Sequence, residues 1–164
     1  MMKVLVEKLH YEKKLVLNHL MELYNYDFSE FENTDVNEFG LYGYKYIDQY
    51  WTDEDRYPYI IRVDGKIAGF VLVRIIGINS NGIKQYSIAE FFVLKKYRRK
   101  SIGKKAAFEI FNTFYGEWKI GQIESNITAY RFWVNVISDY TNGNFNEIRE
   151  VDWDGPMQIF MSKK

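Results

Sequence analysis

A basic turn that opens a helix is the stretch of this sequence best suited to bind phosphate. Seven Lys and Arg residues, and no acidic residue, lie from Lys95 to Lys105. An apolar segment from Ile88 to Leu94 precedes this run, and apolar residues at helical spacing follow it. The free N–H groups of a first helical turn lie at the positive end of the helix dipole. Because Gly103 has no side chain, a phosphate can approach the backbone closely here.

One carboxylate, Glu90, stands inside the apolar segment. Burial raises the pKa of a carboxyl group toward the range in which it accepts a proton at neutral pH. Glu90 is therefore the candidate general base of the sequence. The alternative is a structural ion pair with Arg74 or Arg62, which lie on neighbouring predicted strands.

The composition is that of a globular protein, and we expect a single domain over residues 1–164. Lys and Arg number 22, as do Asp and Glu, and this balance argues against a general nucleic-acid-binding protein. The absence of cysteine excludes a thiol nucleophile and a thiolate metal site, and His10 and His19 form no metal cluster. No apolar run is long enough for a bilayer or a signal peptide, so we expect a cytoplasmic protein without a membrane partner.

Hydrophobic periodicity predicts the elements that position these residues. It indicates helices over Tyr11 to Tyr26, Ser101 to Tyr115 and Ala129 to Tyr140. Asp27 to Phe31 forms either a loop or a short second helix. The alternation of Tyr42, Tyr44 and Tyr46 indicates extended chain, and Ile47, Tyr50 and Trp51 indicate one or two helical turns after it. Periodicity indicates strands over Lys3 to Lys8, Tyr59 to Val63, Lys66 to Ile76, Ile83 to Leu94, Glu117 to Ile123, Asn144 to Val151 and Met157 to Met161. A meander followed by alternating strands and helices predicts an α/β (α+β) fold, with a mixed, mostly antiparallel sheet of about seven strands and helices on both faces.

Two blocks of the sequence resemble the GNAT superfamily of N-acetyltransferases. Its acetyl-CoA-binding signature, Arg/Gln-x-x-Gly-x-Gly/Ala after a strand, corresponds here to Arg98 through Gly103. Its Asn-x-x-Ala-x-x-Phe-Tyr segment is similar to Asn126 through Trp133. The order of elements also looks like that of GNAT domains. The resemblance implies a GNAT-like acyl-CoA N-acyltransferase fold, in which the fourth and fifth strands splay apart around the coenzyme arm.

The resemblance also implies acetyl-CoA as cofactor. The backbone of the basic turn would hold the pyrophosphate, with Arg98 and Lys100 adding charge, and the N–H of Val93 would polarise the acetyl carbonyl. The cofactor-binding residues implied in this way are Phe92, Val93, Leu94, Arg98, Arg99, Lys100, Ser101, Ile102, Gly103, Lys104, Asn126, Ala129, Phe132 and Trp133.

The sequence departs from the family pattern at two positions. Ser101 replaces the first glycine, and we expect its hydroxyl to cap the helix or to donate to phosphate. The alternative is a positive φ at Ser101, with a modest strain cost. Trp133 replaces the tyrosine that serves many members as general acid, and an indole N–H does not deliver a proton usefully. Tyr130 or Tyr140 could substitute, and we carry Tyr140 as the candidate catalytic acid; it fits the apolar core equally well.

In this family the amine acceptor binds between the loop after the first helix and the last hairpin. The resemblance therefore implies Phe28, Phe31, Glu32 and Trp153 as substrate-binding residues. Carboxylates with aromatic rings suit a cationic amine, although the acidic run from Asp27 to Glu38 is equally typical of a solvated face. We expect a small-molecule or peptide amine as substrate, and a monomer or homodimer.

Three functions fit these observations. The leading hypothesis is an acetyl-CoA-dependent N-acetyltransferase in which a primary amine attacks directly within a ternary complex. The first alternative, favoured by Trp133, is a non-catalytic acyl-CoA-binding or sensor module on the same fold. The second is an interaction domain whose basic turn binds an acidic partner.

Overall fold

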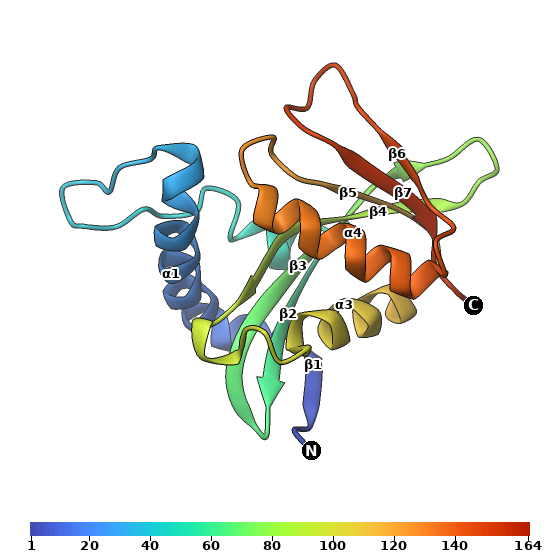
Figure 1. Ribbon diagram of the computed structural model, residues 1–164. Helices are drawn as coiled ribbons and strands as arrows, with labels where there is room; N and C mark the ends of the chain where they lie inside the picture. Colours follow the sequence, from blue (N-terminus) through green and yellow to red (C-terminus); the bar gives the residue numbers. More distant parts are fainter.

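The computed structural model describes residues 1–164 and contains one seven-stranded sheet with helices on both faces (Figure 1). The strand order is β1-β2-β3-β4-β5-β7-β6, and every neighbouring pair is antiparallel except β4 and β5. The strands are β1 (Val4–Lys8), β2 (Arg56–Val63), β3 (Lys66–Ile78), β4 (Lys84–Val93), β5 (Glu117–Gly121), β6 (Asn146–Ile148) and β7 (Met157–Met161). The predicted fold class is confirmed.

The helices begin and end near the predicted positions, with one exception. They are α1 (Lys14–Glu32), α2 (Gln49–Thr52), α3 (Ile102–Thr113) and α4 (Ile127–Thr141), with 3-10 turns η1 (Tyr11–Lys13) and η2 (Lys95–Tyr97). The first helix was predicted to end at Tyr26, but it continues to Glu32 and ends at Asn33, whose φ is 53°. The ring of Phe28 stacks on Tyr24 one turn earlier, with centroids 5.6 Å apart, and such a contact supports the extra turns.

Two apolar clusters divide the molecule into layers. On one face of the sheet, α1 and α2 bury Leu17, Met21 and Tyr50 against the inward side chains of β2, β3 and β4, among them Leu72. On the other face, α3 and α4 bury a larger cluster centred on Phe111. Because successive strand residues face opposite sides, one strand supplies both clusters. None of the helices is both long and apolar enough to cross a membrane.

The parallel pair β4 and β5 is joined only at its start. Gln85 pairs with Glu117 and Tyr86 with Trp118, and no later residue of β4 has a partner on β5. Gly116 permits the close approach, because a Cβ there would lie 2.4 Å from the carbonyl oxygen of Lys84. Beyond this junction the two strands separate (Figure 1), as the resemblance implies.

The separation leaves the second half of β4 with one open backbone edge. The N–H of Leu94 donates to Ala68 at the start of β3, at 2.8 Å. Since N–H groups alternate in direction along a strand, the N–H of Val93 points the other way, toward the opening. A group placed between β4 and β5 can therefore accept a hydrogen bond from Val93.

Candidate functional site

The turn before α3 presents a row of free backbone donors. Arg99 and Ser101 have φ values of 58° and 60°, and α3 begins directly after them. None of the N–H groups from Arg99 to Lys104 donates to another protein atom. Successive free N–H groups of this kind form a concave site for an anion. The turn therefore fits the pyrophosphate that the sequence analysis assigns to it.

Ser101 does not play the part expected of it. Its side chain makes no capping hydrogen bond, and the backbone is left-handed, as it would be for the family's glycine. The expectation of a capping hydroxyl is therefore wrong, and the alternative of a positive φ is correct. The serine is exposed, so its hydroxyl is free to donate to a bound phosphate.

Arg98 is held by contacts with three other residues of the protein. Its Nη2 lies 2.6 Å from Asp27 of α1, and its Nε donates to the carbonyl oxygen of Val93 at 2.7 Å. The guanidinium also lies over the ring of Phe92. Arg98 thus joins α1 to the end of β4, and its contribution of charge to the pyrophosphate site stays a prediction.

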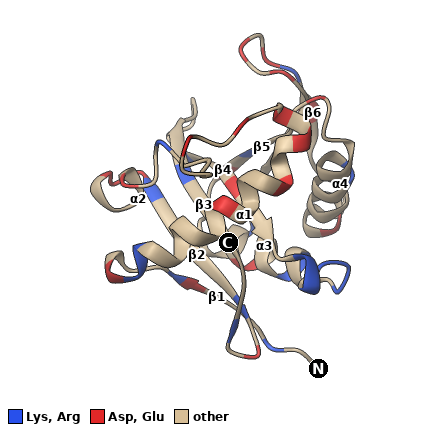
Figure 2. Cartoon of the chain, turned by 90° about the vertical axis from the view of Figure 1, so that its left-hand side faces the viewer, with Lys and Arg blue, Asp and Glu red and all other residues tan.

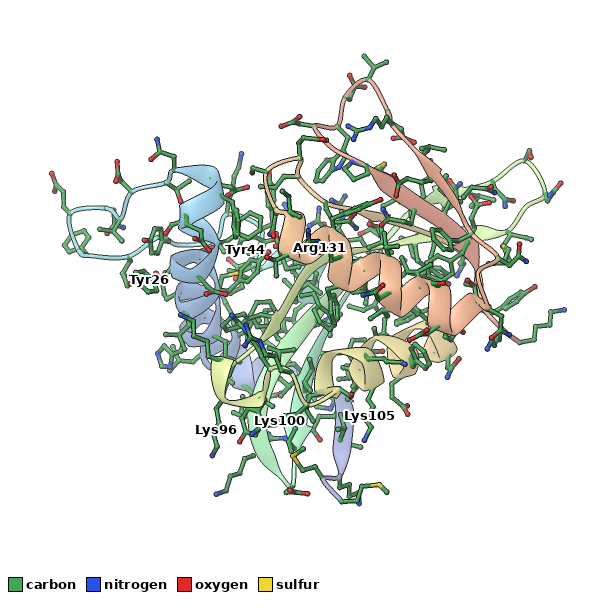
Figure 3. All side chains as sticks on the ribbon, viewed as in Figure 1. Tyr26, Tyr44, Lys96, Lys100, Lys105 and Arg131 are labelled. Atoms are coloured by element: carbon green, nitrogen blue, oxygen red, sulfur yellow. The ribbon has the colours of Figure 1, made fainter.

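The remaining basic residues surround the turn. Lys104 pairs with Asp139 of α4 at 2.7 Å, whereas Arg99 and Lys100 are exposed and make no ion pair. Figure 2 shows basic residues gathered on the loop beside α3. Figure 3 shows Lys96, Lys100 and Lys105 extending from one side of the molecule. Arg99 and Lys100 are thus the side chains of the turn that are available for phosphate.

Aromatic rings pack behind the turn at the start of α4. A Cβ at position 103 would lie 3.0 Å from the ring of Phe132, so the glycine allows this ring to pack closely against the start of α3. Trp133 is buried against Phe91 and Phe132, with ring centroids 4.9 and 5.0 Å away. Asn126 caps α4, because its Oδ1 accepts from the N–H of Ala129 at 3.0 Å.

The other implied cofactor residues lie along the same edge. Phe92 and Val93 are buried on opposite faces of β4, Leu94 contacts both apolar clusters, and Ile102 offers only its backbone because its side chain is 1% exposed. These residues line the end of β4 and the start of α3, as implied. Their contacts with the coenzyme remain predictions.

Tyr140 belongs to the core and not to the site. Its side chain is 2% exposed and packs against Phe108 and Phe111. Its hydroxyl donates to Asn112 at 2.8 Å and accepts from the N–H of Lys163 at 3.1 Å. Because this hydroxyl already donates its proton to Asn112, in the last turn of α3 and away from the basic turn, the candidate role as general acid is withdrawn.

Glu90 accepts hydrogen bonds from two tyrosines. Tyr24 of α1 donates to Oε2, and Tyr44 of the α1–α2 connection donates to Oε1 at 3.3 Å. Figure 3 shows Tyr44 between α1 and the sheet. Burial raises the pKa of Glu90 from 4.5 to about 7, although the two hydroxyl groups oppose this. The carboxyl group thus changes charge near neutral pH.

The alternative of an ion pair at Glu90 is wrong. Arg62 pairs with Glu7 of β1 instead, and no ion pair joins Glu90 to Arg74. Glu90 lies next to an irregularity of β4, because Leu72 faces Glu90 while Val73 faces Ile88. The inserted residue locally bends the strand beside the opening.

The implied substrate residues come from two sides. Phe28 and Phe31 lie on the last turns of α1, where Phe28 stacks on the Tyr24 ring. The charge of Glu32 contributes to the raised pKa of Glu90, so this carboxylate lies nearby. Trp153 lies over Gly121 at the end of β5 and donates from its indole to the carbonyl oxygen of Gln122 at 3.0 Å. Their contact with a substrate remains a prediction.

Sequence reasoning missed Tyr24 and Tyr44. Tyr24 was placed on the apolar face of the first helix, and Tyr44 in an alternating Tyr run, without a role for either. A carboxylate within an apolar strand requires hydrogen-bond donors, and this requirement was the available signal. Which donors it would find depends on the tertiary structure.

Comparisons with known proteins agree with this geometry. A model of the acetyltransferase (GNAT) family matches residues 17–134. No curated protein matches the sequence. An acetyltransferase of the GNAT family from Staphylococcus aureus has a similar structure, with a TM-score of 0.64, 18% identity, and coverage of 98% of this chain and 100% of that chain.

Two further solved structures were found with bound ligands. An aminoglycoside acetyltransferase from an uncultured soil metagenomic sample, in complex with sisomicin, gives a TM-score of 0.66 at 16% identity, over 98% of this chain and 97% of that chain. The PaiA N-acetyltransferase from Thermoplasma acidophilum, in complex with coenzyme A, gives a TM-score of 0.61 at 16% identity, over 95% of this chain and 98% of that chain. At these identities the likeness is one of fold.

Proposed function

Because the chain belongs to the GNAT family of acetyltransferases, we propose that it transfers an acetyl group to a primary amine by direct attack within a ternary complex. Family membership makes the chain an acetyl-CoA-dependent transferase. When bound, acetyl-CoA supplies the acetyl group as an activated thioester. Direct attack is supported by the composition, since a chain without cysteine has no thiol to carry the acetyl group.

Glu90 is the observation that carries the proposal. An amine is protonated at neutral pH and must lose its proton before it can attack. Glu90, with a pKa of about 7, is substantially ionised at neutral pH and is still basic enough to take that proton. The hydroxyl groups of Tyr24 and Tyr44 hold the carboxylate in place beside the open edge of β4. Glu90 therefore acts as general base.

The open edge supplies the second contribution. The N–H of Val93 points into the opening, where it can donate to the carbonyl oxygen of a bound acetyl group as negative charge develops there. No residue of the chain is required to protonate the leaving sulfur, because a thiol has a pKa near ~8.5. This agrees with Trp133 at the position of the family's tyrosine and with the burial of Tyr140.

The experiment measures release of free coenzyme A with a panel of primary amines. We expect turnover by the wild type, and a fall in kcat of about 10²–10⁴-fold for Glu90→Gln with affinity for coenzyme A unchanged. Glu109→Gln, which removes an exposed carboxylate of α3, is the matched control and should behave as wild type. Binding of coenzyme A without turnover of any amine would favour a non-catalytic module instead.

A further inference from the structure

Unpartnered polar atoms gather around α2. Five buried side-chain nitrogen or oxygen atoms have no hydrogen-bond partner, and four of them belong to Gln49, Tyr50, Arg56 and Arg74. Tyr50 is the most buried of these residues, with 2% of its surface exposed. Buried polar groups in native proteins almost always have partners. Several unpartnered groups at one place indicate that a ligand supplies their missing hydrogen-bond partners.

The sheet register places these groups on the face that carries Glu90. Arg56 of β2 lies directly opposite Arg74 of β3. Leu72, two residues before Arg74 on the same strand, lies opposite Glu90 of β4. Because side chains alternate along a strand, Leu72, Arg74 and Glu90 point to the same side, the side covered by α1 and α2. One strand repeat, roughly 7 Å, separates the row of Glu90 from the row of the two arginines.

The two arginines have a single counter-charge between them. Arg56, whose side chain is 12% exposed, has Asp53 at 3.6 Å and lies over the rings of Tyr46 and Tyr50. Arg74 forms no ion pair and donates no hydrogen bond. Like charges directly opposite in an antiparallel pair destabilise the sheet. An anionic group that binds both guanidinium groups would remove this repulsion and satisfy the buried donors.

Tyr50 connects the arginines to the proposed base. Burial raises the pKa of the Tyr50 hydroxyl and the charge of Glu90 adds to this, whereas the neighbouring Tyr44 hydroxyl and the charges of Arg56 and Arg74 oppose it. The hydroxyl is therefore within electrostatic reach of the carboxylate and of both guanidinium groups. A ligand that extends from Glu90 to the arginines would pass along Tyr50.

We propose that Arg56 and Arg74 bind a carboxylate carried by the acceptor, so that the acceptor is an amino acid or a similar small amine with a carboxylate close to its amino group. This inference rests on the proposed function, because it takes Glu90 as the place of the amine. A carboxylate matches the planar fork of an arginine with two parallel hydrogen bonds. The short distance between the rows limits the acceptor to a compact zwitterion.

The test compares acceptors that differ only in the carboxylate. The pairs are phenylalanine with 2-phenylethylamine, leucine with isopentylamine, and lysine with cadaverine. For the wild type we expect the amino acid of at least one pair to have a kcat/KM about 10–100-fold higher than its amine. Arg74→Gln should abolish this preference by raising KM for the amino acid, so that its kcat/KM falls to about that of the amine. Arg62→Gln, a matched control on β2, should retain the preference.

The possible failures are distinguishable. If the wild type turns over amines of these pairs without any preference for the carboxylate, the inference is overturned and the proposed function stands. If the wild type turns over no amine at all, the proposed function is wrong, and this inference is overturned as well. A preference for O-phosphoethanolamine over ethanolamine, without one for the amino acids, would overturn the carboxylate in favour of phosphate.

Thermal unfolding separates binding from a structural role. Because Arg74 has no partner in the free protein, Arg74→Gln should melt at or above the temperature of the wild type. A clear fall in its melting temperature would show that Arg74 supports the fold and would overturn the inference. Addition of the preferred amino acid should then raise the melting temperature of the wild type and not that of the variant.

Discussion

Replacing Glu90 with Gln tests the protonation of this carboxyl group without any knowledge of the acceptor. Burial raises the pKa of Glu90 from 4.5 to about 7 in the folded protein. The folded chain therefore holds this proton more tightly than the unfolded chain does. The stability that this proton contributes is complete below the unfolded pKa and is lost as pH rises through the folded pKa. The difference between 4.5 and about 7 corresponds to about 3 kcal/mol.

The assay is urea denaturation of the wild type and Glu90→Gln at several values between about pH 4.5 and about pH 8. Other groups titrate in this range, so the relevant quantity is the difference in unfolding free energy between the two proteins at each pH. We expect the stability of the wild type to fall relative to the variant by about 3 kcal/mol across the range. Glu109→Gln removes one exposed carboxylate and controls for the change in net charge.

A flat difference would refute the reasoning. It would mean that Glu90 is charged at neutral pH as readily in the folded protein as in the unfolded chain. In that case the hydrogen bonds from the two tyrosine hydroxyl groups cancel the effect of burial on the pKa of Glu90, and the carboxylate is no better a base than an exposed one. A difference of the opposite slope would indicate a cation beside Glu90 that stabilises its charge.

Three further predictions concern other parts of the site. Tyr24→Phe removes a hydrogen bond that lowers the pKa of Glu90, so the acidic limb of the pH–rate profile should move to higher pH; an unmoved limb would contradict the coupling. Lys100→Glu should weaken calorimetric binding of coenzyme A about tenfold, and less at high salt, whereas equal weakening by Lys84→Glu would show a non-specific charge effect. Trp133→Phe should keep the pH–rate profile and lower the unfolding free energy by about 1–3 kcal/mol, and the loss of a basic limb would show that Trp133 takes part in proton transfer.

The fold could be predicted because its signals are local. Apolar segments separated by turn residues, such as Asp64 and Gly65 between β2 and β3, indicate each strand from its own neighbourhood. The end of α1 was misplaced because the last turns depend on the contact between Phe28 and Tyr24 as well as on periodicity. The four-residue spacing of Tyr24 and Phe28 was the available signal for these turns.

The site could be predicted only in part, because its side chains meet across long stretches of sequence. Arg98 forms its ion pair with Asp27, which lies 71 residues away in the sequence. Glu90 finds Tyr24 and Tyr44, 66 and 46 residues away. Ser101 illustrates another limit, since its backbone conformation is set by the turn as a whole and overrides the capping preference of serine.

The brief junction of β4 and β5 has a consequence for how the molecule opens. Backbone pairing joins the two parts of the sheet only at Gln85–Glu117 and Tyr86–Trp118, and the stacked rings of Tyr86 and Trp118 reinforce it. We expect the segments on either side to behave as separate cooperative units in hydrogen exchange, with β1 to β4 in one and β5 to β7 in the other. Amide protons at the junction would then exchange at the rate at which these two units separate. Their exchange rates would therefore report on transient opening of the whole sheet.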